Sequence, residues 1–178
     1  MKFRDIIVYF HGYGSNSNSD KVDRLRKRFP DAEVYAFDIN IDPDLSLMYL
    51  ESEIDSVLMD NLHVPTRMVF VGTSLGAYYA ERMSYLYGTS LYLINPSYDP
   101  CHSLYKYGVK PSICKKYTSM ILASYAKYYI GTNDEVIDYS PILDKIKSYN
   151  VKFVEANHRF NGVEFDGVMD DIAKELYD

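Results

Sequence analysis

The sequence predicts an α/β fold: a doubly wound, mainly parallel sheet of about six strands with helices on both faces. Three observations predict it. Short apolar runs rich in β-branched and aromatic residues recur along the chain, and segments with the period of a helix lie between them. Directly behind one such run, residues 72–76 read Gly-Thr-Ser-Leu-Gly, as at a sharp turn from strand to helix. Because strands alternate with helices, right-handed crossovers should bring the strands together in parallel.

Size and composition favour one globular domain over residues 1–178. The chain has 178 residues, of which 47% are apolar and 25% charged, and it contains no repeat and no linker-like stretch. A formal charge of -6 argues against nucleic acid as a partner, and no apolar run is long enough for membrane insertion. Cys101 and Cys114 are interpreted as free thiols of a cytoplasmic protein rather than as a disulfide. No feature of the sequence sets an oligomeric state.

The predicted strands are the apolar runs, because these runs are too short for helices. They cover residues 6–10, 33–37, 68–71, 91–94, 127–130 and 151–154. Between the first and second predicted strands, the spacing of Val22, Leu25 and Phe29 predicts the apolar stripe of a first helix. The same helix is strongly basic, with Lys21, Arg24, Arg26, Lys27 and Arg28. We expect these charges to face water, with an anion-binding patch as the alternative.

Three further helices follow from apolar spacing. A helix over residues 44–61 collects five apolar side chains on one face, and the helix behind residues 72–76 should stop at Gly88. A C-terminal helix shows the same spacing at Val168, Ile172 and Leu176. In a sheet of this kind, ligands bind beyond the carboxyl ends of the strands, so candidate functional residues should follow directly after each strand.

Ser74 is the candidate nucleophile. A serine held on a strand-to-helix turn adopts a strained backbone, and flanking glycines are needed because side chains would clash where strand and helix close. The alternative is an ordinary turn with a buried structural serine. The preceding strand and the following helix favour the nucleophile.

A second glycine turn follows the first strand, where His11 and Gly12 precede Tyr13. Transfer of an acyl group through a tetrahedral intermediate needs two preorganised donors for the developing oxyanion. The N–H groups of Tyr13 and of Leu75, the residue after Ser74, are the candidates. We expect His11 and Gly12 to border the substrate. A simple glycine turn is the alternative.

An acid and a base follow the last two strands. Asp134 comes shortly after the fifth strand and His158 after the sixth. A serine hydroxyl becomes a good nucleophile when a histidine takes its proton and a carboxylate orients that histidine, and the chain order Ser, Asp, His is the one this fold uses. Asp138 is the alternative acid, and either carboxylate could instead cap the turn that follows. His63 and His102 are weaker candidates for the base, since neither follows the acid.

The connection over residues 96–125 is too long for a short crossover and mixes aromatic groups with lysines. We expect it to form a small helical cap over Ser74, with Tyr98 at the substrate. A lid of this kind excludes water and shapes an acyl pocket. Its lysines could bind an anionic leaving group such as a coenzyme A phosphate, although a solvated basic surface is the simpler interpretation.

Together these motifs resemble the α/β-hydrolase superfamily, and more closely the YqiA-like small bacterial esterases, over nearly the whole chain. The resemblance rests on residues 11–15, 72–80, 94–96, 131–136 and 157–160. It implies Ser74 as nucleophile, Asp134 as acid, His158 as base, and Tyr13 with Leu75 as oxyanion donors. One departure is Ala156, where such sequences commonly have glycine before the Asn-His pair.

The expected function is therefore a serine hydrolase that cleaves carboxylic esters or acyl thioesters, with acyl-CoA among the candidates. The resemblance implies a small-molecule acyl substrate and neither a metal nor an organic cofactor. The alternative is a catalytically idle relative that keeps the fold as a binding module. Amide cleavage, or acyl transfer to an acceptor other than water, is a third hypothesis, because the same acyl-enzyme serves all of them.

Overall fold

The structure is a computed structural model that describes residues 3–60 and 62–177. Its strands are β1 (Arg4–Phe10), β2 (Glu33–Ala36), β3 (Thr66–Thr73), β4 (Ser90–Ile94), β5 (Lys127–Gly131) and β6 (Asn150–Val154). Its helices are α1 (Asp20–Arg28), α2 (Pro43–Met59), α3 (Leu75–Tyr87), α4 (Pro100–Lys106), α5 (Pro111–Cys114), α6 (Leu143–Lys147) and α7 (Glu164–Tyr177).

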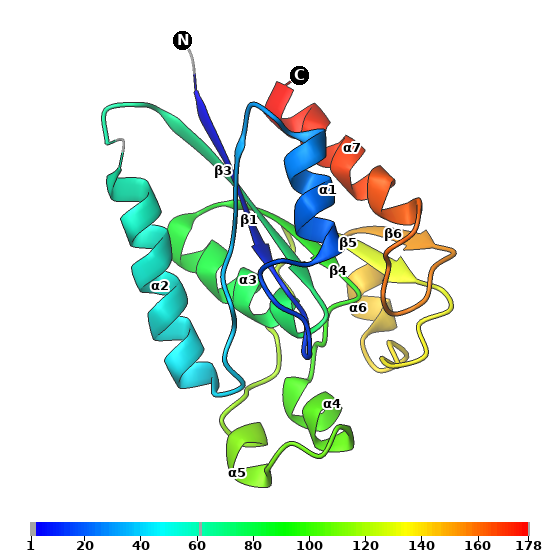
Figure 1. The fold of residues 1–178 in the computed structure, drawn as a ribbon. Helices are drawn as coiled ribbons and strands as arrows, with labels where there is room; N and C mark the ends of the chain where they lie inside the picture. Colours follow the sequence, from blue (N-terminus) through cyan, green and yellow to red (C-terminus); the bar gives the residue numbers. More distant parts are fainter. Residues whose placement is uncertain (1–2, 61, 178) are drawn as a thin grey trace.

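The strands form a single open sheet in the order β2-β1-β3-β4-β5-β6, and every neighbouring pair is parallel (Figure 1). The predicted doubly wound sheet is therefore confirmed. The chain passes from β1 outward to β2 and then returns to β3 on the other side of β1. The carboxyl ends of β1 and β3 thus flank the point where the strand order reverses, which is where open α/β sheets bind ligands.

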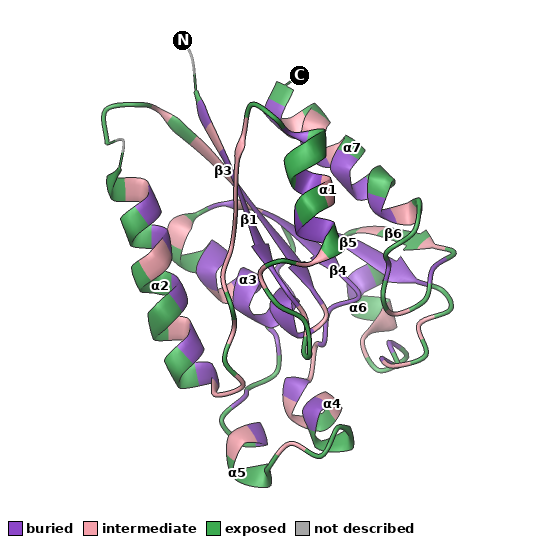
Figure 2. Ribbon diagram, in the orientation of Figure 1, coloured by how far each residue is buried: buried purple, intermediate pink, exposed green. Residues whose placement is uncertain are grey.

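The core has two parts, one on each face of the sheet. Helices α2 and α3 cover one face, and α1 and α7 lie side by side on the other, where Arg24 pairs with Asp166 and Arg28 with Asp170 (Figure 1). Central strands are buried on both faces, as Figure 2 shows, and they read as nearly continuous apolar runs for that reason.

Helix boundaries follow local signals. The side chain of Asp42 accepts a hydrogen bond from the Asp44 N–H (3.1 Å) and Pro43 occupies the first turn of α2. The predicted helix over 44–61 is confirmed in its described part, and its expected end at Asn61 lies outside the described residues. Helix α3 ends as predicted at Gly88, whose φ of 64° is the left-handed conformation that favours glycine.

One expectation about α1 was wrong. Lys21 does not face water: only 9% of it is exposed, because the first turn of α1 packs against the loop after β6. The Lys21 Nζ donates to the Arg159 carbonyl oxygen (2.6 Å) and lies 5.6 Å from the ring centre of Phe165. Arg26, Lys27 and Arg28 are exposed, as expected.

The segment 96–125 contains the short helices α4 and α5, which lie beyond the carboxyl ends of β1 and β3 (Figure 1). Its far end is tied down by the buried Glu81 of α3, whose carboxylate accepts hydrogen bonds from the N–H groups of Ile121 and Ala123 (both 2.9 Å). Cys101 and Cys114 are free thiols. Within the described ranges, no helix combines the length and apolar character needed to cross a membrane.

Candidate active site

Ser74 occupies the turn between β3 and α3 with φ 55° and ψ -119°, a conformation that non-glycine residues rarely adopt. The turn is tight because backbone surrounds it. A Cβ atom at Gly76 would lie 2.0 Å from the Phe10 carbonyl oxygen, and one at Gly72 would lie 2.6 Å from the Ala77 Cα. Only glycine fits at these two positions, so the spacing seen in the sequence reflects the packing of α3 against β1 and β3.

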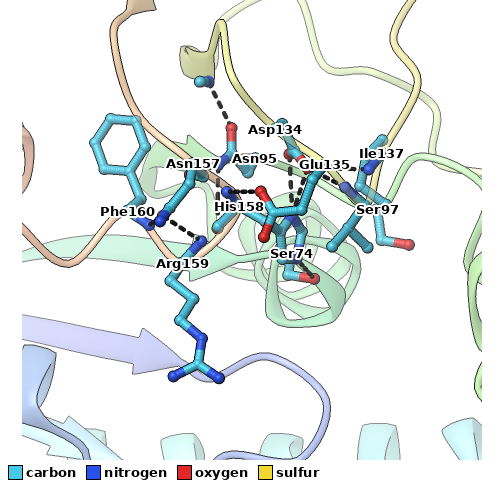
Figure 3. Close-up of polar contacts among 12 residues, drawn as sticks. Ser74, Asn95, Ser97, Asp134, Glu135, Ile137, Asn157, His158, Arg159 and Phe160 are labelled. Carbon is cyan, nitrogen blue, oxygen red and sulfur yellow. Dashed lines mark hydrogen bonds and ion pairs between the residues drawn. The ribbon is translucent and has the colours of Figure 1, made fainter.

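Three side chains from three loops meet at this turn (Figure 3). The His158 Nε2 lies 2.9 Å from the Ser74 Oγ, and the His158 Nδ1 lies 2.9 Å and 3.0 Å from the two carboxylate oxygens of Asp134. With Asp134 ionised, Nδ1 carries the proton and donates it, which leaves Nε2 free to accept from the serine hydroxyl. The structure thus brings together the three residues that the sequence proposed as nucleophile, base and acid.

Asp134 is held in its ionised form by hydrogen bonds. Burial is the largest single influence on it and opposes ionisation, but the contact with His158 and the N–H groups of Ile137 and Val136 together outweigh burial. They lower the pKa of Asp134 below its ordinary value. Its side chain is 2% exposed. A permanently ionised, buried carboxylate is what an imidazole needs if it is to become an imidazolium.

The alternative candidates lie elsewhere. The Asp138 carboxylate accepts from the N–H (2.9 Å) and hydroxyl (2.9 Å) of Ser140 and so stabilises a turn. His63 is exposed on the loop before β3. His102, on α4, borders a separate pocket with Cys101.

The turn after β1 lies against the serine. A Cβ atom at Gly12 would lie 3.2 Å from the Ser74 Cβ, so a side chain there would crowd the nucleophile candidate. Among residues 3–60 and 62–177, no acceptor takes a hydrogen bond from the N–H of Tyr13 or of Leu75. Both donors remain available, and Leu75 is the first residue of α3, whose N-terminus carries partial positive charge. The two turns can therefore stabilise an oxyanion.

Two residues expected at the substrate are placed differently. His11 is buried: its Nε2 accepts from the Ile39 N–H (3.0 Å) and its Nδ1 donates to the Gly12 carbonyl oxygen (2.9 Å), so the ring fixes the turn instead of bordering the cleft. The Tyr98 hydroxyl donates to the Asp138 carbonyl oxygen (3.0 Å) and its ring packs near Tyr139. Neither side chain borders the cleft that contains Ser74.

That cleft has a volume of about 660 Å³ and opens directly above Ser74 and His158. Gly12 and Tyr13 border it, and so do Ser103, Leu104 and Tyr107 of the 96–125 segment. Tyr13 and Tyr107 meet across it, with ring centres 5.7 Å apart. The first turn of α1 and the loop after His158 form another wall, with Ser19, Asp20, Lys21, Arg159 and Asn161, and residues 135–137 also border the cleft.

Two residues that position the site were not identified from the sequence. Asn95 is fully buried after β4, with φ 42°; its Nδ2 donates to the carbonyl oxygens of Asn157 (3.0 Å) and His158 (3.1 Å), and its Oδ1 accepts from the Gly131 N–H (2.7 Å). The Glu135 carboxylate accepts from the His158 N–H (3.0 Å), which lowers the pKa of Glu135. Asn95 follows a strand end and lies in one of the segments that carry the family resemblance, but neither signal assigned it a role.

Chemically, this arrangement can activate a hydroxyl, hold a developing oxyanion and return a proton to a leaving group. No group of three or more metal-binding side chains occurs in the described part of the chain.

Comparison with known proteins places the chain among proteins of related fold. A model of the family described as "Uncharacterised protein family (UPF0227)" matches residues 6–120. The UPF0227 protein YcfP of Escherichia coli K12 is 32% identical over 101 residues, which cover 56% of this chain and 54% of YcfP. The aligned region thus spans about half the length of the curated relatives it matches.

Solved structures extend the likeness to nearly the whole chain. Mouse alpha/beta hydrolase domain-containing protein 10 superposes with a TM-score of 0.67 at 17% identity, covering 96% of this chain and 90% of that one. The Pyrococcus furiosus esterase Pf2001 superposes with a TM-score of 0.72 at 15% identity, covering 98% and 81%. The expected resemblance to the α/β-hydrolase fold is confirmed.

Proposed function

The chain belongs to the UPF0227 family, and from this premise and the geometry of the cleft we propose that it is a serine hydrolase. It cleaves carboxylic esters or acyl thioesters through an acyl-Ser74 intermediate. One observation carries the proposal: the continuous chain of hydrogen bonds from the Ser74 Oγ through the His158 ring to the Asp134 carboxylate. A merely structural serine has no need of an oriented imidazole and a buried carboxylate behind it.

The reaction proceeds in two halves. The Ser74 oxygen attacks the acyl carbon while its proton moves to the His158 Nε2, and the carbonyl oxygen takes up the negative charge. When the tetrahedral intermediate collapses, the bond to the leaving alcohol or thiol breaks and the imidazolium donates its proton to that group. Water then repeats the sequence on the acyl-enzyme, with His158 again as base, and releases the carboxylic acid and free Ser74.

The oxyanion is stabilised by the N–H groups of Tyr13 and Leu75. Loss of one such donor typically costs about 3 to 4 kcal/mol of transition-state stabilisation. His11 contributes indirectly, because its two hydrogen bonds fix the turn that presents the Tyr13 N–H. The strain stored at Ser74 keeps its hydroxyl directed into the cleft instead of into the first turn of α3.

The segment 96–125 acts as a cap within a single catalytic domain. Its residues border the cleft from the side opposite α1, and Tyr107 touches Tyr13 at the rim. Acyl groups enter along this aromatic rim. The free thiols of Cys101 and Cys114 support a role in a reducing compartment such as the cytoplasm.

Turnover of acyl substrates tests the proposal. p-Nitrophenyl esters and acyl-CoAs of increasing chain length should be hydrolysed by the wild-type protein, and Ser74→Ala should lower kcat by at least about 10⁴-fold. Ser148→Ala, at an exposed serine on α6's C-terminal side, serves as the matched control and should keep the wild-type rate. Equal rates for wild type and Ser74→Ala would rule out an acyl-Ser74 mechanism.

A catalytically idle binding module is the second candidate. It is disfavoured because a binding protein gains nothing from two unoccupied oxyanion donors and a strained serine at one point of the cleft. A module of that kind would bind acyl compounds with no turnover, and equilibrium binding without product would identify it.

A further inference from the structure

Lys21 is a buried cation that the proposed reaction does not use. It is 9% exposed, and its Nζ has one hydrogen-bond partner among the described residues, the Arg159 carbonyl oxygen. No carboxylate in residues 3–60 and 62–177 forms an ion pair with it. Burial of a charge without a counter-charge is costly, and lysines are rarely found in this situation. Two of the three N–H donors of Lys21 are thus left without a partner in the described part of the chain.

Other donors surround Lys21 at the same wall of the cleft. The Ser19 Oγ is shielded from solvent and has no hydrogen-bond partner among the residues that the structure describes, although Ser19 stands directly before α1. The first turn of α1 adds free N–H groups and the positive end of the helix dipole. Arg159 borders the cleft as well, and its guanidinium extends away from the contacts around His158 (Figure 3).

Asp20 and Glu135 also border the cleft, and neither forms an ion pair with Lys21. Asp20 is exposed, and the Glu135 carboxylate accepts a hydrogen bond from the His158 N–H. Burial and, after it, the nearby Arg24 guanidinium lower the pKa of the Lys21 ammonium to about 8, although the charges of Asp20 and Glu164 oppose this shift. Lys21 therefore remains mostly charged near neutral pH. The wall is therefore cationic and rich in donors.

Its place relative to His158 indicates what it would bind. The Lys21 Nζ contacts Arg159, the residue after the proposed base. In the proposed mechanism His158 delivers its proton to the leaving alcohol or thiol, so this side of the cleft receives the leaving group, whereas the turns at Tyr13 and Leu75 receive the carbonyl oxygen.

We propose that Lys21, together with Ser19 and Arg159, binds an anionic oxygen group, carboxylate or phosphate, on the leaving alcohol or thiol of the substrate. This inference rests on the proposed function and specifies its substrate class. Neutral esters react at Ser74 without this contact, whereas esters with an anionic leaving group gain a charge-assisted hydrogen bond from the Lys21 Nζ.

Matched substrates test it. In 4-acetoxybenzoate and 4-acetoxyphenyl phosphate the leaving phenol is anionic, and in 4-acetoxybenzamide it is neutral. Lys21→Met should lower kcat/KM for one or both anionic esters by at least about tenfold. It should change kcat/KM for the neutral ester, 4-acetoxybenzamide, by less than about twofold. The two anionic arms separate a carboxylate from a phosphate preference. Lys27→Met, at an exposed lysine of the same helix, is the control and should alter none of the three.

A second measurement needs no variant at Lys21. On the wild-type protein, 4-hydroxybenzoate or 4-hydroxyphenyl phosphate should protect Ser74 from a fluorophosphonate at concentrations at least about tenfold lower than 4-hydroxybenzamide. This measurement keeps the inference testable even if Lys21→Met folds poorly.

Several outcomes would overturn the inference. One is an equal effect of Lys21→Met on anionic and neutral esters, and another is equal protection by the charged and neutral phenols. A third is a loss of kcat/KM in Lys21→Met that is larger for monophenyl succinate, whose charge is on the acyl side, than for the neutral phenyl 4-oxopentanoate. Failure of the proposed function would look different, because Ser74→Ala would then hydrolyse all of these esters at the wild-type rate.

Discussion

At the scale of single residues, the site combines one strained backbone with one buried ion. Ser74 is held at positive φ by glycine contacts on both sides, and Asp134 is held ionised by four hydrogen-bond donors from His158, Val136, Ile137 and Tyr139. His158 lies between them and touches both. The hydrogen bond at Nδ1 therefore assigns the orientation of the imidazole towards Ser74 to Asp134.

Replacement of the acid tests that assignment. Asp134→Asn keeps the shape of the side chain but offers an amide to the His158 Nδ1, which favours the wrong tautomer, so kcat should fall by about 10⁴-fold. Asp138→Asn, four residues along the same loop, should leave kcat within about twofold of wild type because the Asp138 carboxylate is hydrogen-bonded to Ser140 and not to His158. Steady-state hydrolysis of one p-nitrophenyl ester measures both. If the two variants were impaired equally, Asp134 would not be the acid.

The buried charge of Lys21 should lower the stability of the folded protein, although the proposed anion site requires it. Lys21→Met removes an unpaired buried charge and keeps the apolar stem, so the free energy of unfolding at pH 7 should rise by roughly 2 kcal/mol. The native ammonium loses its proton near pH 8 and the unfolded one near its ordinary pKa of 10.5. Between these pH values the unfolded chain binds more protons than the folded one. The destabilisation of the folded wild type by the buried Lys21 charge therefore decreases as pH rises.

The stability gained in Lys21→Met should therefore shrink from pH 8 towards pH 10.5. Denaturant unfolding of wild type and variant at several pH values measures this difference. A variant that is less stable than wild type at pH 7, or a difference that grows with pH, would contradict the assignment of Lys21 as an unpaired cation.

At the scale of secondary-structure elements, the site depends on how closely α3 approaches β1. That approach is set by Gly76, where any Cβ would meet the carbonyl carbon and oxygen of Phe10 and the carbonyl oxygen of His11. The backbone atoms of a buried strand cannot shift to make room for a side chain. The distance between the turn at Ser74 and the turn after β1 is therefore fixed by the absence of a side chain at Gly76.

Gly76→Ala should consequently lower the free energy of unfolding by at least about 3 kcal/mol or prevent folding. Gly167→Ala gives the matched comparison: Gly167 is an exposed position inside α7 where an added Cβ meets nothing within 4 Å. There alanine should stabilise the helix by up to about 1 kcal/mol. Thermal and denaturant unfolding measure both changes, and a tolerated Gly76→Ala would mean that α3 can withdraw from β1.

Local elements were largely predictable from the sequence. Each of the six strands was found within a few residues of its place. The central strands are buried on both faces and so leave continuous apolar runs, and the edge strands β2 and β6, which are less buried, were recognised from shorter runs of β-branched and aromatic residues. Gly88 marked the end of α3 through its own backbone preference. The orientation of Lys21 was not predictable: it depends on contact with Arg159, far away in the chain, and helical periodicity carries no information about that contact.

At the scale of the whole molecule, the sheet topology gathers the site. Ser74, Asp134 and His158 follow β3, β5 and β6, and the oxyanion turn follows β1, so four strand ends of one parallel sheet meet at a single cleft. The candidate residues were predictable because they follow strand ends in the expected order. Asn95 was missed as a positioning residue because its role lies in joining β4, β5 and the His158 loop, which are neighbours only in the folded sheet.

In this account the fold turns Ser74 into a nucleophile. Reaction with a fluorophosphonate, followed by mapping of the modified peptide, measures that reactivity at the serine itself. The native protein should carry one adduct, on Ser74, while His158→Ala and the wild-type protein unfolded in guanidinium should carry none. An unreactive native protein, an adduct on another residue, or undiminished labelling of His158→Ala would contradict the claim.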